Sequence, residues 1–223
     1  MTPAPVELYA GALGRGSLYI RTEDGLRRAL PLEQWLGPLE PADAGALDRA
    51  PGPVLDVGCG PGRHVVALAR RGELALGVDI TPAAVRFARA RGARVMRGSV
   101  FAPIPGAGRW RTALLLDGNI GIGGRPVELL LRLRQLLQDN GRVVCELDPP
   151  GSPTRSELVA LEDVEGVRSV WFAWARVSVG GVDRTAARAG MEVDELWQQD
   201  GRWFATLSGA HHTVSNSICT ASV

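Results

Sequence analysis

The stretch that decides the fold is Val54-Leu55-Asp56-Val57-Gly58-Cys59-Gly60-Pro61-Gly62-Arg63. Its first four residues are mostly apolar and predict a short buried strand, and the alternating glycines predict a tight turn. Residues 63–71 have helical spacing and are followed by Gly72, a good C-terminal cap. Strand, glycine turn and helix make half of a nucleotide-binding βαβ unit. Its glycines let the backbone approach a ligand, and its helix start offers unpaired N–H groups.

A second acid lies at the end of the next apolar run, residues 74–78. This acid, Asp79, closes the second predicted strand of the βαβ unit. A carboxylate at this place can accept hydrogen bonds from both hydroxyls of a ribose. The glycine turn and Asp79 together therefore predict a nucleoside-binding site.

The pattern Asp-x-Gly-x-Gly-x-Gly from Asp56 to Gly62, with an acid closing the next strand, resembles the class I S-adenosylmethionine-dependent methyltransferases. The main competitor is a nicotinamide-dinucleotide enzyme, whose fingerprint is Gly-x-Gly-x-x-Gly; counted from Gly58, its last position falls on Arg63. The resemblance covers about residues 51–209. It implies one Rossmann-like α/β domain, with a mostly parallel seven-stranded sheet, helices on both faces and an antiparallel final strand.

The resemblance also implies a set of residues that bind S-adenosylmethionine. They are Asp56, Gly58, Cys59, Gly60, Gly62, Asp79, Ile80, Ser99, Val100 and Asp117. Ser99 departs from the family pattern, because many relatives carry there an acid that binds the exocyclic amine of adenine. No metal is expected at this site.

Acidic residues end or follow the fourth and fifth predicted strands, residues 112–117 and 142–146. Ligands of open α/β sheets bind beyond the carboxyl ends of the strands. Asp117 is therefore the first candidate for orienting the acceptor or acting as a general base, followed by Glu146 and Asp148. Asp117 could instead bind backbone N–H groups of the glycine-rich loop that follows it. In-line methyl transfer mainly needs alignment and exclusion of water, and it needs a base only for a protonated nucleophile.

Candidates for binding the acceptor are Asn119, Trp171, Trp174 and Arg176. Three of them belong to an aromatic segment at about residues 167–177, in a chain that is only 5% aromatic. Indole rings suit a flat or apolar acceptor, and Arg176 suits a carboxylate or phosphate. Alternate members of the segment could equally be core residues of a strand.

The chain outside the motif divides into three parts. Residues 1–50 form an N-terminal cap, in which residues 18–30 predict a hairpin around Asp24-Gly25 and residues 31–36 a short helix. Residues 51–209 form the methyltransferase domain with its aromatic insertion. Residues 210–223 are rich in serine and threonine without periodicity and predict a flexible tail.

Composition limits the classes of partner. The 223 residues carry a net charge of +1, which gives no reason to expect nucleic acid or an acidic membrane surface. All 25 basic residues are arginine, so lysine Schiff-base chemistry is excluded, and three scattered cysteines predict neither a disulfide framework nor a zinc site. Without a secretory signal or a long apolar segment, we expect a cytoplasmic monomer or homodimer that does not bind membranes.

The sequence thus predicts an S-adenosylmethionine-dependent methyltransferase acting on a small-molecule substrate. One alternative uses the same cofactor differently, by aminocarboxypropyl transfer or cyclisation; the unusual loop at residues 117–124 leaves it open. Another alternative is a non-catalytic regulator that binds the cofactor without turnover.

Overall fold

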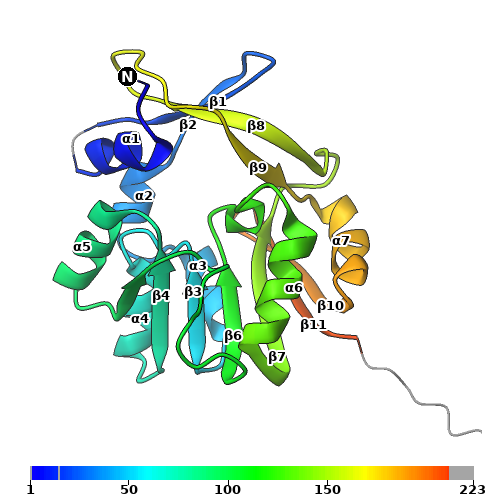
Figure 1. The fold of residues 1–223 in the computed structure, drawn as a ribbon. Helices are drawn as coiled ribbons and strands as arrows, with labels where there is room; N and C mark the ends of the chain where they lie inside the picture. The colour runs from blue at the N-terminus through cyan, green and yellow to red at the C-terminus, as the bar shows by residue number, and fades with distance from the viewer. Residues whose placement is uncertain (1, 15, 211–223) are drawn as a thin grey trace, which may run out of the picture.

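A seven-stranded sheet forms the centre of the molecule in the computed structural model, which describes residues 2–14 and 16–210 (Figure 1). Its strand order is β10-β11-β7-β6-β3-β4-β5. The strands are β3 (Val54–Val57), β4 (Ala75–Asp79), β5 (Val95–Arg97), β6 (Trp110–Leu115), β7 (Leu137–Leu147), β10 (Met191–Gln199) and β11 (Arg202–Gly209).

Strands β5, β4, β3, β6 and β7 are parallel to their neighbours, and β11 runs antiparallel to both β7 and β10. Every residue of β3 is buried, as expected for a parallel strand covered on both faces. Val54 lies opposite Ala75 on one side and Thr112 on the other, so the glycine turn starts at the middle of the sheet. The predicted mostly parallel sheet with an antiparallel strand at its end is confirmed.

Helices cover both faces of this sheet, and each layer of helices has its own apolar core. One core contains Val65 and Leu68 of α4 together with Val85 of α5, and the other contains Leu129 of α6 and Val182 of α7. The helices of the two faces are α3 (Pro41–Asp48), α4 (Arg63–Arg70) and α5 (Pro82–Ala90) on one side, and α6 (Pro126–Leu136) and α7 (Val182–Arg188) on the other.

Gly62, the residue before α4, holds that helix close to its neighbour. Its backbone is left-handed, with φ +80°, and an added Cβ would lie 2.8 Å from Cβ of Ala88 and 3.0 Å from Cβ of Ala93. A side chain at this position would therefore push α4 away from α5. The last glycine of the turn serves helix packing.

A second, four-stranded sheet lies across the carboxyl ends of the main strands (Figure 1). This small sheet has the order β2-β1-β8-β9, all antiparallel, and combines β1 (Tyr19–Thr22) and β2 (Arg27–Ala29) with β8 (Arg155–Glu162) and β9 (Phe172–Arg176). The predicted N-terminal hairpin is confirmed. Its pairing with β8 was not predicted, because nothing local in either segment indicates the partner.

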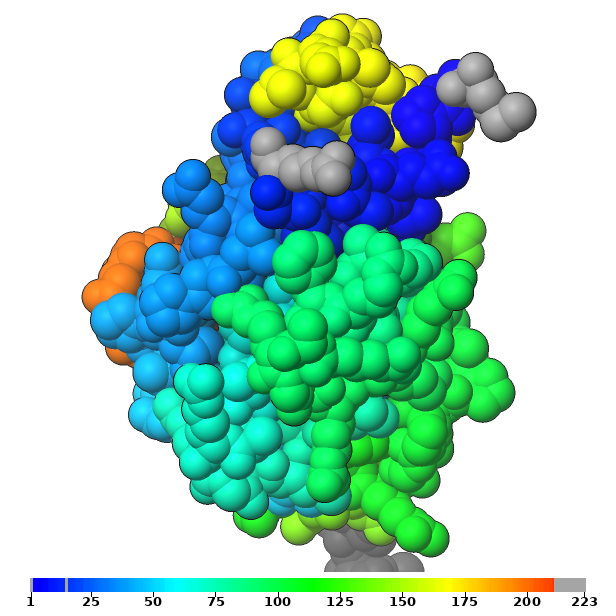
Figure 2. Space-filling model, turned by 90° about the vertical axis from the view of Figure 1, so that its left-hand side faces the viewer, coloured from blue at the N-terminus to red at the C-terminus, as the bar shows by residue number. Residues whose placement is uncertain are grey.

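The two faces of the small sheet differ in chemistry. Ile20 lies opposite both Arg28 of β2 and Leu161 of β8, so these three side chains share the inner face. The outer face carries ion pairs, in which Glu162 lies 2.7 Å from Arg27 and 3.5 Å from Arg21. In the space-filling view, the N-terminal segment (blue) and the segment that contains β8 (yellow) pack together above the main domain (Figure 2).

Two short helices pack between the small sheet and the main domain. They are α1 (Pro5–Ala12) and α2 (Leu32–Leu36), and Leu13 after α1 packs on Ala83 and Ala84 of α5. The sequence predicted α2 but neither α1 nor α3. No helix in the described part of the chain is long and apolar enough to span a membrane.

Some predicted boundaries were wrong. Helix α6 stops at Leu136 and β7 starts at once at Leu137, so Asn140 and Gly141 lie within a strand that was expected to begin at Arg142. Two η turns, η1 (Asn119–Gly121) and η2 (Val179–Gly181), complete the described elements. Of the predicted tail, residues 211–223 lie outside the described residues.

Candidate active site

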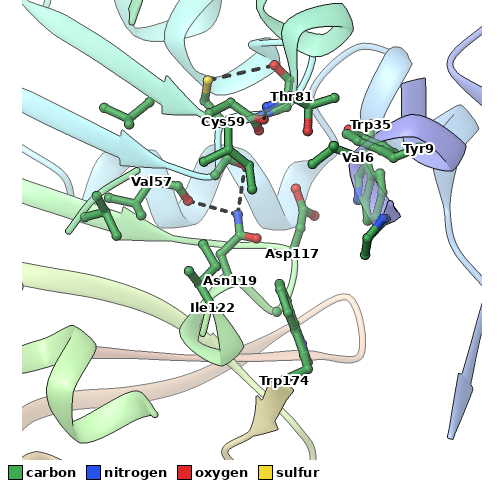
Figure 3. A pocket seen from close by; sticks show the side chains of 18 of the residues that line it. Val6, Tyr9, Trp35, Val57, Cys59, Thr81, Asp117, Asn119, Ile122 and Trp174 are labelled. Carbon is green, nitrogen blue, oxygen red and sulfur yellow. Dashed lines mark hydrogen bonds between the residues drawn. The ribbon is translucent and has the colours of Figure 1, made fainter. Parts of the chain in front are cut away.

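A cavity of about 480 Å³ separates the glycine turn from the small sheet. Figure 3 shows its two sides. Cys59 and Thr81 lie on the side of the main domain, and Tyr9 of α1, Trp35 of α2 and Trp174 of β9 lie on the other side. The walls come from segments far apart in sequence, including α1, the β1–β2 hairpin, β8 and β9. We refer to this space as the first cavity.

The glycine turn forms the floor of the first cavity. Gly58 and Gly60 have φ of +72° and +51°, a region that a side chain would strain. A Cβ on Gly60 would lie 3.1 Å from the hydroxyl of Tyr9, and one on Gly58 would meet the amide of Asn119 at 2.8 Å. The turn is therefore open to a ligand only because both positions lack a side chain.

Asp79 stands at the end of β4, buried beside the turn. Its Oδ2 accepts a hydrogen bond from N–H of Gly60 at 2.9 Å, and its Oδ1 accepts one from N–H of Thr81 at 2.7 Å. Burial raises the pKa of Asp79, and these two backbone donors oppose the rise. Each oxygen keeps capacity for a further donor, which is the requirement for binding ribose hydroxyls.

The end of the first cavity beyond Asp79 is formed by Ile80 and by Ser99, Val100 and Phe101 after β5. Oγ of Ser99 accepts a hydrogen bond from N–H of Phe101 at 3.2 Å, which leaves its hydroxyl proton available. No acid replaces the missing family carboxylate among the lining residues of this end. Ser99 and the backbone are the polar groups left there.

Two residues of the predicted cofactor set, Asp56 and Gly62, do not line the cavity. Asp56 is 1% exposed and lies below the turn, where its Oδ2 is 3.6 Å from Nδ1 of His64. Nε2 of His64 is likewise 3.6 Å from Oδ1 of Asp43. Burial alone would lower the pKa of His64, but the two carboxylates outweigh it and raise that pKa to about 9.

Asp117 lines the cavity as predicted, but it is tightly bound by its surroundings. Both carboxylate oxygens accept hydrogen bonds from Nη2 of Arg63, at 2.7 and 2.9 Å. The N–H of Asp117 donates to Oε2 of Glu146 at 2.7 Å, and its backbone has φ 57°. A proton accepted by Asp117 would weaken the pairing of a buried guanidinium, so this geometry disfavours a general base.

Arg63 and Asp117 belong to a larger network of buried and half-buried charges. Arg63 also pairs with Asp43 of α3, which in turn receives Nη1 of Arg202 at 2.7 Å. Arg202 binds both oxygens of Glu146, at 2.9 and 2.7 Å. Burial lowers the pKa of Arg63, but its carboxylate neighbours raise it overall, so the arginine stays charged. The network joins α3, α4, β7 and β11 beneath the cavity.

Glu146 and Asp148 do not line the first cavity. They line a second, adjoining cavity of about 380 Å³. Asp148 follows β7 and accepts hydrogen bonds from Arg176 at 2.8 and 3.0 Å. The predicted catalytic residue Asp148 and the predicted acceptor-binding residue Arg176 therefore form an ion pair with each other. The structure therefore does not bring Glu146 or Asp148 together with Asp117 at the cavity surface next to Asp79.

The remaining predicted residues divide in the same way. Asn119 and Trp174 line the first cavity, whereas Trp171 lines neither cavity and is 46% exposed. The amide of Asn119 donates to the carbonyl oxygens of Val57 and Gly58, both at 3.0 Å, and so fastens the η1 turn to the glycine turn.

Sequence reasoning missed most of the cavity wall on the side of the small sheet. The missed residues are mainly apolar or aromatic: Val6, Tyr9, Ile20, Leu30, Trp35 and Leu161, with Arg28 beside them. Burial first, and then Asp79 and Asp117, raise the pKa of Tyr9, so its hydroxyl stays protonated. The sequence predicted the β1–β2 hairpin, but it did not predict the pairing of β1 with β8, which determines the face of the hairpin that lines the cavity.

Comparison with known proteins finds one family model, described as a methyltransferase domain, that matches residues 54–109. A human lysine N-methyltransferase, named for ATP synthase, is 30% identical over 124 residues, which are 54% of this chain. The match spans 51% of that relative, so the chain corresponds to about half of its length.

Solved structures show the same fold over more of the chain. A methyltransferase from Bacteroides fragilis, in complex with S-adenosyl-L-homocysteine, has a TM-score of 0.73 at 22% identity and covers 93% of each chain. The 1,6-didemethyltoxoflavin-N1-methyltransferase of Burkholderia thailandensis has a TM-score of 0.56 at 19% identity, covering 77% of this chain and 78% of its own. The matched family model shows that residues 54–109 are similar to a methyltransferase domain, and the solved structures, with the glycine turn, the acid ending β4 and the sheet order, show that the chain has the class I methyltransferase fold.

Proposed function

We propose that the protein transfers the methyl group of S-adenosylmethionine to a small molecule with an apolar or flat body. The observation that carries this proposal is the first cavity, whose floor is the glycine turn and whose opposite wall is the apolar inner face of the small sheet. The toxoflavin-type enzyme, which by its name methylates a small molecule, has a similar fold. The human relative is named for a protein lysine, so the acceptor has to be tested directly.

The residues of the first cavity fit the parts of the cofactor. Asp79 has free acceptor capacity for ribose hydroxyls, Gly58 and Gly60 leave room for the methionine part, and Ser99 can contact the base. When bound, S-adenosylmethionine supplies an electrophilic methyl group on a sulfonium cation. Aromatic side chains such as Trp174 can lie beside such a cation without competing for its charge.

The chain's own contribution is alignment and exclusion of water. Phe172 and Trp174 of β9 and Leu161 of β8 offer an apolar wall against which a flat acceptor can be held in one orientation. Of the lining side chains with a hydroxyl or carboxylate near that wall, Tyr9 stays protonated and Asp117 is held by Arg63, so neither is suited to accept a proton. We infer that acceptors with an unprotonated nucleophile, such as a neutral amine, are preferred over those that must lose a proton to a side chain.

A screen of small acceptors with isotopically labelled S-adenosylmethionine tests the proposal. We expect labelled methyl product and S-adenosylhomocysteine in equal amounts. Asp79→Ala should weaken binding of S-adenosylhomocysteine by roughly ten- to a hundredfold, because it removes hydrogen bonds to a charged group. Asp139→Ala, which removes an exposed carboxylate near the start of β7, should bind normally.

Other outcomes would contradict the proposal. Methylthioadenosine as the by-product would indicate aminocarboxypropyl transfer, and tight cofactor binding with no turnover on any acceptor would indicate a regulator. If the methyl group is transferred only to a lysine-containing peptide of ATP synthase, the acceptor is a protein and not a small molecule.

A further inference from the structure

The second cavity adjoins the first around a shared set of residues. Residues that line both are Arg28, Leu30, Trp35, Asp117, Gly118 and Trp174. A ligand lying beside Trp174 in one cavity can therefore extend past it into the other. Neither Asp79 nor the glycine turn lines the second cavity.

The two cavities differ in the chemistry of their walls. On the side of the small sheet the wall of the first cavity is apolar except for Arg28, with Ile20, Leu161 and Phe172. The second cavity is lined by charged groups, among them Glu146, Asp148, Arg176 and Arg202. An acceptor filling both would need an apolar part and a polar part.

The carboxylates of the second cavity already have partners. Glu146 is bound through both oxygens by Arg202, and Asp148 through both oxygens by Arg176. Asp117 is bound in the same manner by Arg63. These pairs are neutral as units and hold each other in place, so none of them presents a free charge to a ligand.

Arg28 differs from the other arginines of this region. It lies on the inner face of β2, opposite Ile20, and borders both cavities. Its neighbours Arg21 and Arg27 turn to the outer face and pair there with Glu162. Within residues 2–14 and 16–210, Arg28 has no carboxylate within 4 Å. The second cavity thus has one unpaired cation at its edge.

Trp174, which separates the two cavities, is held in place by backbone contacts. Its backbone forms a bridge with Ile122, and it packs so closely on two glycines that added Cβ atoms would meet it. A Cβ on Gly121 would lie 2.5 Å from the indole nitrogen, and one on Gly124 would lie 3.3 Å from the Trp174 backbone nitrogen. The partition between apolar and polar parts is therefore fixed by the fold.

We propose that the acceptor is an amphiphilic anion. Its apolar body lies against Trp174 in the first cavity, and its anionic group, a carboxylate or phosphate, binds Arg28 at the entrance of the second. This inference rests on the proposed function, since it describes the acceptor of that reaction. A planar guanidinium binds such anions through two parallel hydrogen bonds.

Two fluorescent probes with the same rings test the charge preference. Anilinonaphthalene sulfonate carries an anionic group, and N-phenylnaphthylamine lacks it. Both are titrated into protein saturated with S-adenosylhomocysteine. We expect the wild type to bind the sulfonate more tightly, and Arg28→Gln to weaken its binding roughly fivefold without affecting the neutral probe. Arg111→Gln, which removes an exposed strand arginine at the start of β6, is the matched control and should change neither probe.

Trp174→Ala should weaken binding of both probes, because both share the ring contact. Equal affinities of Arg28→Gln and wild type for the sulfonate would overturn the inference. The same holds if Arg111→Gln weakens it as much, since the effect would then be one of net charge. Saturation with S-adenosylhomocysteine is itself measured, so failure of the cofactor to bind would count against the proposed function and not against the role of Arg28.

Discussion

Asp117 illustrates how one residue can take a role that its place in the sequence does not reveal. It follows the fourth strand of the parallel sheet, at the edge where catalytic groups of such folds gather, and it borders the first cavity. Its carboxylate nevertheless faces Arg63, and its N–H is bound by Glu146. The sequence also allowed a structural role, in which the carboxylate of Asp117 binds backbone N–H groups of its own glycine-rich loop. The carboxylate is indeed held in a structural contact, but its partner is Arg63.

We predict that Asp117→Asn lowers stability more than catalysis. Breaking a buried ion pair costs about 3–5 kcal/mol of unfolding free energy. The rate of methyl transfer should fall less than about tenfold, compared with the 10²–10⁴-fold typical of a lost general base. Denaturant titration and single-turnover rates measure the two effects.

The matched control for this prediction is Asp48→Asn. Asp48 lies 2.7 Å from Arg71, but its side chain is 67% exposed, so the change should cost less than about 1 kcal/mol. A hundredfold slower Asp117→Asn enzyme with unchanged stability would instead make Asp117 a base.

At the scale of elements, the glycine turn combines two separate tasks. Gly58 and Gly60 keep the floor of the first cavity free, whereas Gly62 lets α4 approach α5. All three glycines appear in one motif, from which a single ligand-binding role was predicted for them. Only the packing of Ala88 and Ala93 against Gly62 separates helix contact from ligand contact.

Gly62→Ala and Gly72→Ala form a matched pair that isolates this contact. Both glycines have φ +80°, but an added Cβ meets two alanines at position 62 and nothing within 4 Å at position 72. Gly72→Ala should therefore cost about 1–2 kcal/mol for backbone strain alone. Gly62→Ala should cost about 1–3 kcal/mol more for overpacking, measured by urea denaturation.

The same pair also bears on function. A displaced start of α4 should weaken binding of S-adenosylhomocysteine in Gly62→Ala but not in Gly72→Ala. Equal stability of the two variants would show that α4 and α5 can separate at no cost.

Elements marked by local signals were predictable from the sequence. The βαβ unit was read from its glycines, and the N-terminal hairpin from Asp24-Gly25. The pairing of β1 with β8 and of Arg63 with Asp117 was not, because it depends on segments brought together only by the complete fold. The side of the first cavity formed by the glycine turn was therefore largely predicted, and the side formed by the small sheet was not.

At the scale of the whole molecule, stability should depend on pH through His64. The native state raises the pKa of His64 from 6.5 to about 9, so it holds a proton that the unfolded chain releases. This stabilisation is fully present below about pH 6.5 and is lost as the pH rises to about 9. The expected loss of unfolding free energy is about 3 kcal/mol.

Denaturant titrations across this pH range check the prediction, and His64→Gln should abolish the dependence. Burial raises the pKa values of the thiols of Cys59 and Cys145 above their ordinary value of 9.0, so their own loss of stability begins as the pH approaches 9, and the slope below about pH 8 reports His64. A wild type whose stability is constant from pH 6.5 to 9 would show that His64 is neutral in the folded protein.

The small sheet also constrains how the protein is made. Strand β1 emerges from the ribosome early, but its partner β8 follows only after nearly all of the parallel sheet has been synthesised. At typical elongation rates this delay is on the order of ten seconds. During that time the hairpin presents an unpaired strand edge, which Arg21 and Arg27 shield from association with other nascent chains. The glycine turn and Asp79 are synthesised well before then, so one wall of the first cavity exists in the nascent chain before β8 and β9 can complete the other.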